Sequence, residues 1–250
     1  METTAQNDGI RIFSSSTLKI LACIFMFIDH LGARVFPGYI IFRIIGRLAF
    51  PIFAFMIAEG CHYTRNKLKY FLQVFLLGVI CDLVYFFYAG KLQGNILLTF
   101  SCSILIIFAL QLCKQAWHDG GVARRILFTG LFVLTVASLW ALTRFYRVDY
   151  GFMGVLVPVF PALVAYKEGK TPKFFKNLDR HAVKLACFSA GLLLLVLKQG
   201  ITATQTWSLL AILPLALYNG RRGVKWMKYG FYLFYPLHLL LVEGIALLVL

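Results

Sequence analysis

Long apolar runs separated by short polar stretches make up most of the chain. An α-helix rises about 1.5 Å per residue, so about 20 apolar residues are needed to cross the hydrocarbon layer of a bilayer. Nine runs meet this requirement approximately. They cover residues 18–35, 40–61, 69–89, 96–113, 126–143, 150–166, 182–198, 201–218 and 230–249. The pattern predicts an all-α, polytopic integral membrane helix bundle with about nine transmembrane helices, within a range of eight to ten.

Two of the nine runs are the weakest candidates. Pro158 and Pro161 interrupt the sixth run, and the eighth run opens on the polar stretch ITATQTW and contains Pro214. Proline removes a backbone donor and disrupts a helix interior. A tilted, kinked or re-entrant segment is therefore the alternative to a full crossing at both places.

Composition supports the membrane class. The chain is 60% hydrophobic and 14% charged, whereas a soluble domain is close to half apolar and about a quarter charged. The six cysteines lie in or beside apolar runs and form no CxxC pair, so they are interpreted as small buried hydrophobes and no disulfide framework is expected.

The net charge of +15 is concentrated in every second loop between the apolar runs. These loops hold Arg65, Lys67, Lys69, Lys114, Arg124, Arg125, Lys167, Lys170, Lys173, Lys176, Arg180, Lys184, Arg221, Arg222, Lys225 and Lys228. The loops between them carry few basic residues. The positive-inside rule then predicts a cytoplasmic N-terminus and an extracytoplasmic C-terminus.

This topology predicts a simple domain organisation. Residues 1–17 are expected to form a short cytoplasmic tail, and residues 18–250 a single transmembrane domain. The first apolar run contains Asp29 and His30 and lacks a convincing small-residue cleavage site, so it is interpreted as a retained span rather than a signal peptide.

Ionisable residues inside the first two runs are the main functional signal. Lys19, Asp29, His30, Arg43, Arg47 and Glu59 all fall there. A charge near the middle of a bilayer costs about 3 kcal/mol even on lenient scales, so such residues usually face the bundle interior and have a function. The topology places Lys19 and Glu59 near the cytoplasmic side. It places the other four in the outer half of the membrane.

Asp29 and His30 are neighbours on one helix and point about 100° apart, so they cannot form a face-to-face dyad. A membrane histidine is a candidate general base, proton carrier or haem ligand, or it simply bonds to another helix. Arg43 and Arg47 are four residues apart and suit a fork for phosphate or carboxylate. The alternatives are that they neutralise Asp29 and Asp82, or reach outer headgroups.

Other candidates lie along the rest of the chain. Glu59 and His62, with Arg65, close the second run at the cytoplasmic face, with a snorkelling helix end as the alternative. Asn95 is expected to line the cavity or to bond an adjacent helix. His238 follows Pro236 in an aromatic run. Two interpretations stay open, an active-site histidine on a kinked helix and a histidine with only a structural role.

The sequence contains no GxxxxGK[ST], GxGxxG, HExxH or GxSxG motif. An energised pump and a metalloprotease are therefore not favoured, and no metal is expected.

Five segments together resemble the TraX family, which is named for a conjugative-pilus protein that N-acetylates pilin. They are LKILACIFMFIDHLG, RIIGRLAFPIFAFMIAEGCHYTRN, NILLT, DYGFMGVLVP and NGRRG followed by KYGFYLFYPLHLL, in order over roughly residues 17–245. The resemblance implies a multi-pass acetyltransferase of the bacterial cytoplasmic (inner) membrane, with acetyl-CoA as donor and an amine or hydroxyl acceptor on the far side. The acceptor, whether peptide amine, glycan or lipid hydroxyl, stays open, and no nucleic acid is expected.

By that resemblance Asp29, His30, Arg43 and Arg47 fall at the active site, with His238 close to it. The donor is expected near Arg47 and near four residues towards the cytoplasmic side, Lys19, Glu59, His62 and Arg65. The acceptor is expected near Asp82, Asn95, Asp149 and Tyr150.

The sequence leads to one mechanistic hypothesis and two rivals. His30, oriented by Asp29 or Asp82, removes the acceptor's proton, and the two arginines hold the thioester oxygen, the pantetheine or a phosphate. Direct transfer and an acyl-histidine intermediate both stay open. The rival is a proton-coupled transporter or flippase built on the same residues, although no copy of DHLG or GRLAFP occurs in the second half. A catalytically inactive scaffold is the third reading.

Overall fold

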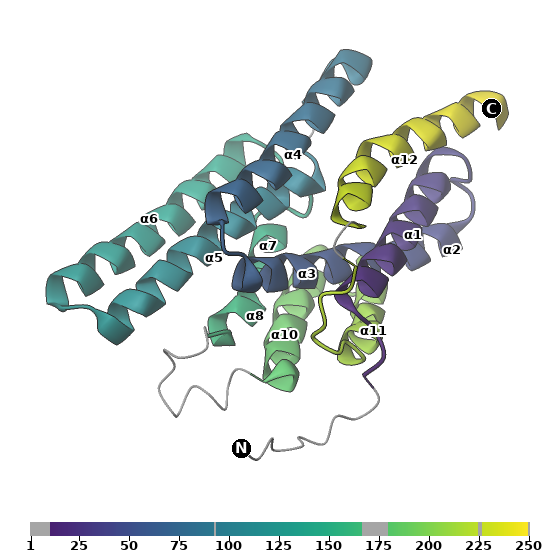
Figure 1. Cartoon of the computed structure of the whole chain (residues 1–250). Helices are drawn as coiled ribbons and strands as arrows, with labels where there is room; N and C mark the ends of the chain where they lie inside the picture. The colour runs from purple at the N-terminus through teal and green to yellow at the C-terminus, as the bar shows by residue number, and fades with distance from the viewer. Residues whose placement is uncertain (1–10, 93, 167–179, 225–226, 250) are drawn as a thin grey trace. The chain divides into compact units, whose positions relative to one another are not determined.

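The computed structural model describes residues 11–92, 94–166, 180–224 and 227–249. These residues form helices and no named strand, apart from a single parallel bridge between Phe13 and Tyr218. The elements are α1 (Ser15–Arg34), α2 (Ile40–Gly46), α3 (Ala49–Tyr63), α4 (Lys67–Ala89), α5 (Ile96–Asp119), α6 (Val122–Phe145), α7 (Gly151–Leu156), α8 (Val159–Val164), α10 (His181–Gln199), the 3₁₀ helix η1 (Thr204–Ala211), α11 (Ile212–Ala216) and α12 (Met227–Val249) (Figure 1).

The all-helical membrane architecture is confirmed. Within the described ranges, seven helical stretches are long and apolar enough to cross a bilayer. They are Ser15–Arg34, Ile40–Tyr63, Lys67–Phe87, Ile96–Asp119, Val122–Phe145, His181–Gln199 and Gly230–Val249. The sixth and eighth predicted runs are shorter or broken, so the expected count of nine spans is not reached by long helices alone.

The breaks follow the local chemistry. The second run divides at Arg47 and Leu48, and Pro51 sits in the first turn of α3, where a missing N–H leaves no helical bond unmade. The sixth run divides beside Pro158, between α7 and α8. The eighth run becomes η1 followed by the short helix α11, which contains Pro214.

The described chain divides into two compact units. Unit 1 comprises residues 1–53 and 202–250, and unit 2 comprises residues 54–201. Part of the predicted topology lies outside the described residues, namely most of the N-terminal tail and the loop residues Lys167, Lys170, Lys173, Lys176 and Lys225.

In unit 1, α1 packs against both α2 and α12, and α2 also packs against η1. Two glycines allow the close approach of α1 and α2. A Cβ added at Gly32 would collide with the Phe42 side chain, and one added at Gly46 would collide with the Asp29 side chain. The segment before α1 is tied to the segment after α11, since Phe13 N–H donates to the Leu217 carbonyl at 3.0 Å and Asn219 N–H to the Phe13 carbonyl at 2.9 Å.

In unit 2, α5 is the central helix and contacts α4, α6, α7 and α8. The broken sixth run follows α5 along its length. At one end Thr99 Oγ1 donates to the Asp149 carbonyl at 3.0 Å, and at the other end Lys114 Nζ donates to the carbonyls of Ala162 and Leu163, both at 2.7 Å. The pair α7 and α8 therefore spans the same stretch as residues 99–114 of α5.

Candidate functional site

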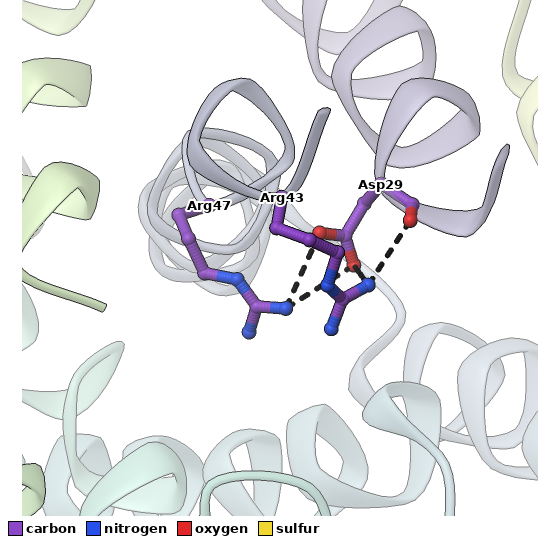
Figure 2. Close-up of polar contacts among 3 residues, drawn as sticks. All are labelled: Asp29, Arg43 and Arg47. Atoms are coloured by element: carbon purple, nitrogen blue, oxygen red, sulfur yellow. Dashed lines mark hydrogen bonds and ion pairs between the residues drawn. The ribbon is translucent and has the colours of Figure 1, made fainter. Parts of the chain in front are cut away.

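The most concentrated charge in unit 1 is a cluster of Asp29, Arg43 and Arg47. Arg43 Nη1 donates to Asp29 Oδ2 at 2.8 Å and to the Asp29 backbone carbonyl at 3.0 Å. Arg47 Nη2 donates to Asp29 Oδ1 at 3.2 Å and to Oδ2 at 3.4 Å. Figure 2 shows both guanidinium groups converging on the one carboxylate of α1. The predicted alternative in which the arginines neutralise Asp29 is thus the observed arrangement.

This cluster carries an excess positive charge. One carboxylate faces two guanidinium groups, which stay protonated in proteins, so the formal sum is +1. The side chains of Asp29 and Arg47 are only 19% and 15% exposed. Two partly buried guanidinium groups side by side favour an anion or a developing negative charge on a bound molecule.

Sequence-local features hold the cluster in place. Arg43 and Arg47 lie one helical turn apart, and Arg47 caps α2 with its N–H directed back to the Arg43 carbonyl at 3.1 Å. Gly46 leaves the space that the Asp29 side chain fills. Helix α2 therefore ends at Gly46, one residue before Arg47, and both arginine side chains contact the Asp29 carboxylate.

His30 and His238 form a second pair beside this cluster. Their ring centroids lie 5.0 Å apart, with the rings at 69° to each other. His238 is 2% exposed, and its Nδ1 lies 3.0 Å from the Phe234 carbonyl. A carbonyl only accepts hydrogen bonds, so Nδ1 carries the proton and Nε2 carries a lone pair. Among the described residues, that buried Nε2 has no hydrogen-bond partner.

An ion pair joins the two helices that carry these histidines. Arg34 donates from Nε to Glu243 Oε1 at 2.6 Å and from Nη2 to Oε2 at 2.7 Å. The pair is bidentate, but the two side chains are 47% and 34% exposed, so its net worth is about 1 kcal/mol or less. Its effect is to fix the register of α12 against α1, one turn from His30. The sequence did not predict that Arg34 and Glu243 would pair.

Two further buried polar residues of unit 1 lie on η1. Gln205 is 2% exposed and Ser208 is 0% exposed. In the described part of the chain, both amide atoms of Gln205 and the hydroxyl of Ser208 lack a hydrogen-bond partner. Leaving a buried polar group unpaired costs about 1–3 kcal/mol. The polar opening of the eighth run hinted at them, but the sequence did not show that both side chains would be buried.

The predicted acceptor residues gather in unit 2. Asp82 Oδ1 accepts from the Gly94 N–H at 3.0 Å, and Asp82 Oδ2 accepts from the Tyr146 hydroxyl. Asn95 caps α5 through Oδ1 and donates from Nδ2 to the Gly78 carbonyl at 2.7 Å. These contacts join the ends of α4, α5 and α6.

Asp149 and Tyr150 complete this junction at the start of α7. The Asp149 N–H donates to the Gly94 carbonyl at 3.1 Å. Tyr150 has a φ of 61°, a left-handed conformation that costs a non-glycine residue about 1–3 kcal/mol. Burial, with the hydrogen bond to Asp82, raises the pKa of the Tyr146 hydroxyl above its usual range, so Tyr146 stays a neutral donor.

The predicted donor residues are divided between the units. Lys19 lies in unit 1, with Nζ 5.8 Å from the centre of the Phe231 ring. Glu59 lies in unit 2, where one of its carboxylate oxygens is 3.8 Å from Lys184 Nζ and both side chains are nearly buried. Arg65 lies exposed in the turn between α3 and α4.

His62 lines a polar pocket of about 320 Å³ in unit 2. The other lining residues are Lys67, Gln111, Lys114, Gln115, His118, Asp119, Ala165 and Tyr166. His62 lies in the last turn of α3, and the others come from the start of α4, the last turns of α5 and the residues just after α8. Lys114 lies over the Tyr166 ring at 4.3 Å from its centre. The pocket thus joins the ends of three segments that the charge pattern assigns to the cytoplasmic side.

The structure therefore brings together all five predicted catalytic residues in unit 1 and all four predicted acceptor residues in unit 2. The Asp29 carboxylate accepts hydrogen bonds from Arg43 and Arg47. The Asp82 carboxylate accepts hydrogen bonds from Gly94 and Tyr146 within unit 2. Within the described residues, the His30 ring contacts His238 and makes no hydrogen bond to either carboxylate.

Comparison with known proteins assigns the family. The model of the family described as "TraX protein" matches residues 14–246. The chain belongs to the TraX family. A TraX-like relative from Dichelobacter nodosus, "Probable fimbrial assembly protein FimC, serogroup H1", is 26% identical over 92% of this chain and 94% of its own length. "Uncharacterized protein RP591" of Rickettsia prowazekii (strain Madrid E) is 27% identical over 69% of this chain and 60% of its own length. No solved structure matches significantly. The expected family is thereby confirmed.

Proposed function

We propose that this TraX-family protein is a membrane-embedded acetyltransferase that moves an acetyl group from acetyl-CoA to an amine or hydroxyl acceptor. The observation that carries the proposal is the histidine pair beside a positively charged cluster. His238 Nδ1 is held by a carbonyl, so Nε2 is the ring position that can accept a proton.

The reaction uses this pair and cluster as follows. The acceptor's N–H or O–H gives its proton to His238 Nε2 while the acceptor atom attacks the thioester carbonyl carbon. The C–S bond then breaks, and the thiolate of CoA takes the proton from the imidazolium. The excess positive charge of the cluster of Asp29, Arg43 and Arg47 stabilises the negative charge that develops on the carbonyl oxygen.

The assignment of the base to His238 departs from the sequence-based hypothesis, which favoured His30. His30 lies against His238 and is the more exposed ring of the two, so it is positioned to meet the acceptor. The N-terminus is proposed to be cytoplasmic and the membrane the bacterial inner membrane. The name of the Dichelobacter nodosus relative supports a subunit of a surface fibre as one class of acceptor.

The test is an acetyl-transfer assay on purified protein in detergent, with labelled acetyl-CoA and membrane extract as acceptor source. We expect His238→Ala to lower the rate by about 10²-fold or more, the usual contribution of a general base. His181→Ala, which removes the histidine of unit 2 whose ring packs against Phe55, serves as the control and keeps the wild-type rate.

Two results would argue against this assignment. If His30→Ala loses the rate and His238→Ala keeps it, His30 is the base. If no variant differs from wild type and proteoliposomes show substrate counterflow that does not need acetyl-CoA, the protein is a transporter.

A further inference from the structure

The buried residues of η1 are regularly spaced, and the proposed acetyl-transfer reaction gives them no role. A 3₁₀ helix has three residues per turn, so side chains three apart lie directly above one another. Gln205, Ser208 and Ala211 have this spacing, and they are the three buried residues of η1. Two of these three buried residues are polar, whereas a buried face that served only for packing would be apolar.

The three polar atoms of this face lack protein partners within the described chain. They are Nε2 and Oε1 of Gln205 and Oγ of Ser208. Two other fully buried serine hydroxyls bond back to their own helix. Ser101 and Ser103 reach the carbonyl four residues earlier at 2.8 and 3.1 Å. Ser208 does not, so its hydroxyl is left for another molecule.

The location of η1 ties this face to the proposed site. Helix η1 packs against α2, the helix that carries Arg43 and ends at Arg47. A run of eight residues is also long for a 3₁₀ helix, which usually ends after three or four. The extended 3₁₀ geometry is what places both polar side chains on one line.

We propose that Gln205 and Ser208 form a binding site for a secondary amide group. A glutamine side chain pairs with a secondary amide through both of its ends, because Nε2 donates to the amide carbonyl and Oε1 accepts from the amide N–H. The serine hydroxyl adds one more donor and acceptor. This inference rests on the proposed function for its two sources of such an amide, the pantetheine arm of acetyl-CoA and the backbone of a peptide acceptor.

The experiment measures ligand-dependent melting of the full-length protein in detergent. The probes are S-acetylpantetheine, the blocked peptide N-acetyl-alanyl-alanine methylamide and S-acetylmercaptoethanol, a thioester without an amide. The variants are Gln205→Met and Ser208→Ala, made singly so that either one suffices if the other fails to fold. Ser103→Ala is the control, since it removes a buried hydroxyl that already has partners.

We expect at least one amide probe, and not S-acetylmercaptoethanol, to raise the melting temperature of the wild type. Gln205→Met and Ser208→Ala should weaken that binding at least tenfold while melting, without ligand, at or above the wild-type temperature. Ser103→Ala should melt lower and keep the wild-type affinity. The probe that binds identifies the source of the amide.

The inference is overturned if neither amide probe binds the wild type, or if both variants bind as the wild type does. It is also overturned if the variants melt lower and keep their affinity, because these atoms then serve an internal water. Amide binding that depends on Gln205, found together with no acetyl transfer, would leave this site standing and reject the acetyltransferase. Acetyl transfer without amide binding would leave the acetyltransferase standing and reject the amide site.

Discussion

At the scale of single residues, the candidate site of unit 1 consists of Asp29 and His30 on α1, Arg43 and Arg47 at α2, and His238 on α12. Asp29, His30, Arg43 and Arg47 stand out because charge is costly in apolar helices. Their pairing depends on how helices distant in the sequence pack. His30 was expected to be oriented by a carboxylate, yet its ring contacts His238, which is 208 positions further along the chain. Gln205 and Ser208 are uncharged and gave no comparable signal.

The charge balance of the cluster leads to a prediction for Asp29→Asn. This change removes the carboxylate that both partly buried guanidinium groups contact. We expect a loss of roughly 2–3 kcal/mol, below the ~3–5 kcal/mol seen when a fully buried pair is broken, because the Asp29 side chain is 19% exposed. Thermal melting in detergent measures it, with a shift of roughly 5–10 °C.

Asp119→Asn is the matched control for that measurement. Its carboxylate contacts His118 and is 34% exposed, so the same chemical change is expected to stay within about 0.5 kcal/mol of wild type. Equal melting of the two variants would mean that the arginines do not depend on Asp29 for their charge balance.

At the scale of elements, the apolar runs predicted where helices lie, and proline predicted two of the three places where they break. The sixth and eighth runs, identified as the weakest, are those that divide into short helices. The length of the 3₁₀ segment was not predictable, because no composition rule distinguishes it from an α-helix. Small residues at the packing of α1 and α2 gave no sequence signal either, since glycine also occurs in turns.

The close packing at Gly46 leads to a prediction for Gly46→Ala. The added Cβ would collide with the Asp29 side chain, which cannot move aside without losing both arginines. We expect this strain to destabilise the protein by about 1–3 kcal/mol, against a gain in helix propensity of about 1 kcal/mol. The acetyl-transfer rate should fall together with the melting temperature.

Gly38→Ala tests whether the effect comes from the collision. A Cβ at Gly38 meets nothing within 4 Å, so this variant should melt and react as the wild type does. If Gly46→Ala also behaves as the wild type, Asp29 is not held by close packing of α2.

At the scale of the whole molecule, the alternation of basic loops predicted which helix ends lie together. In unit 2 the ends of α3 and α5, the start of α4 and the residues after α8 meet around the polar pocket. Asp82, Gly94, Asn95 and Asp149 join the opposite ends of the helices. This arrangement is what an alternating topology requires of α4 to α8. The sequence did not predict the division into two units, because it depends on contacts between distant segments.

Acetyl transfer across a membrane of known orientation tests the proposed activity and its sidedness in one experiment. Inverted vesicles, which expose the cytoplasmic face, are given labelled acetyl-CoA and compared with right-side-out vesicles. We predict that inverted vesicles containing the wild-type protein acquire label on an acceptor, and that right-side-out vesicles and the His238→Ala variant do not. Labelling equal to that of vesicles without the protein would contradict the proposed function, and equal labelling by His238→Ala would contradict the proposed base.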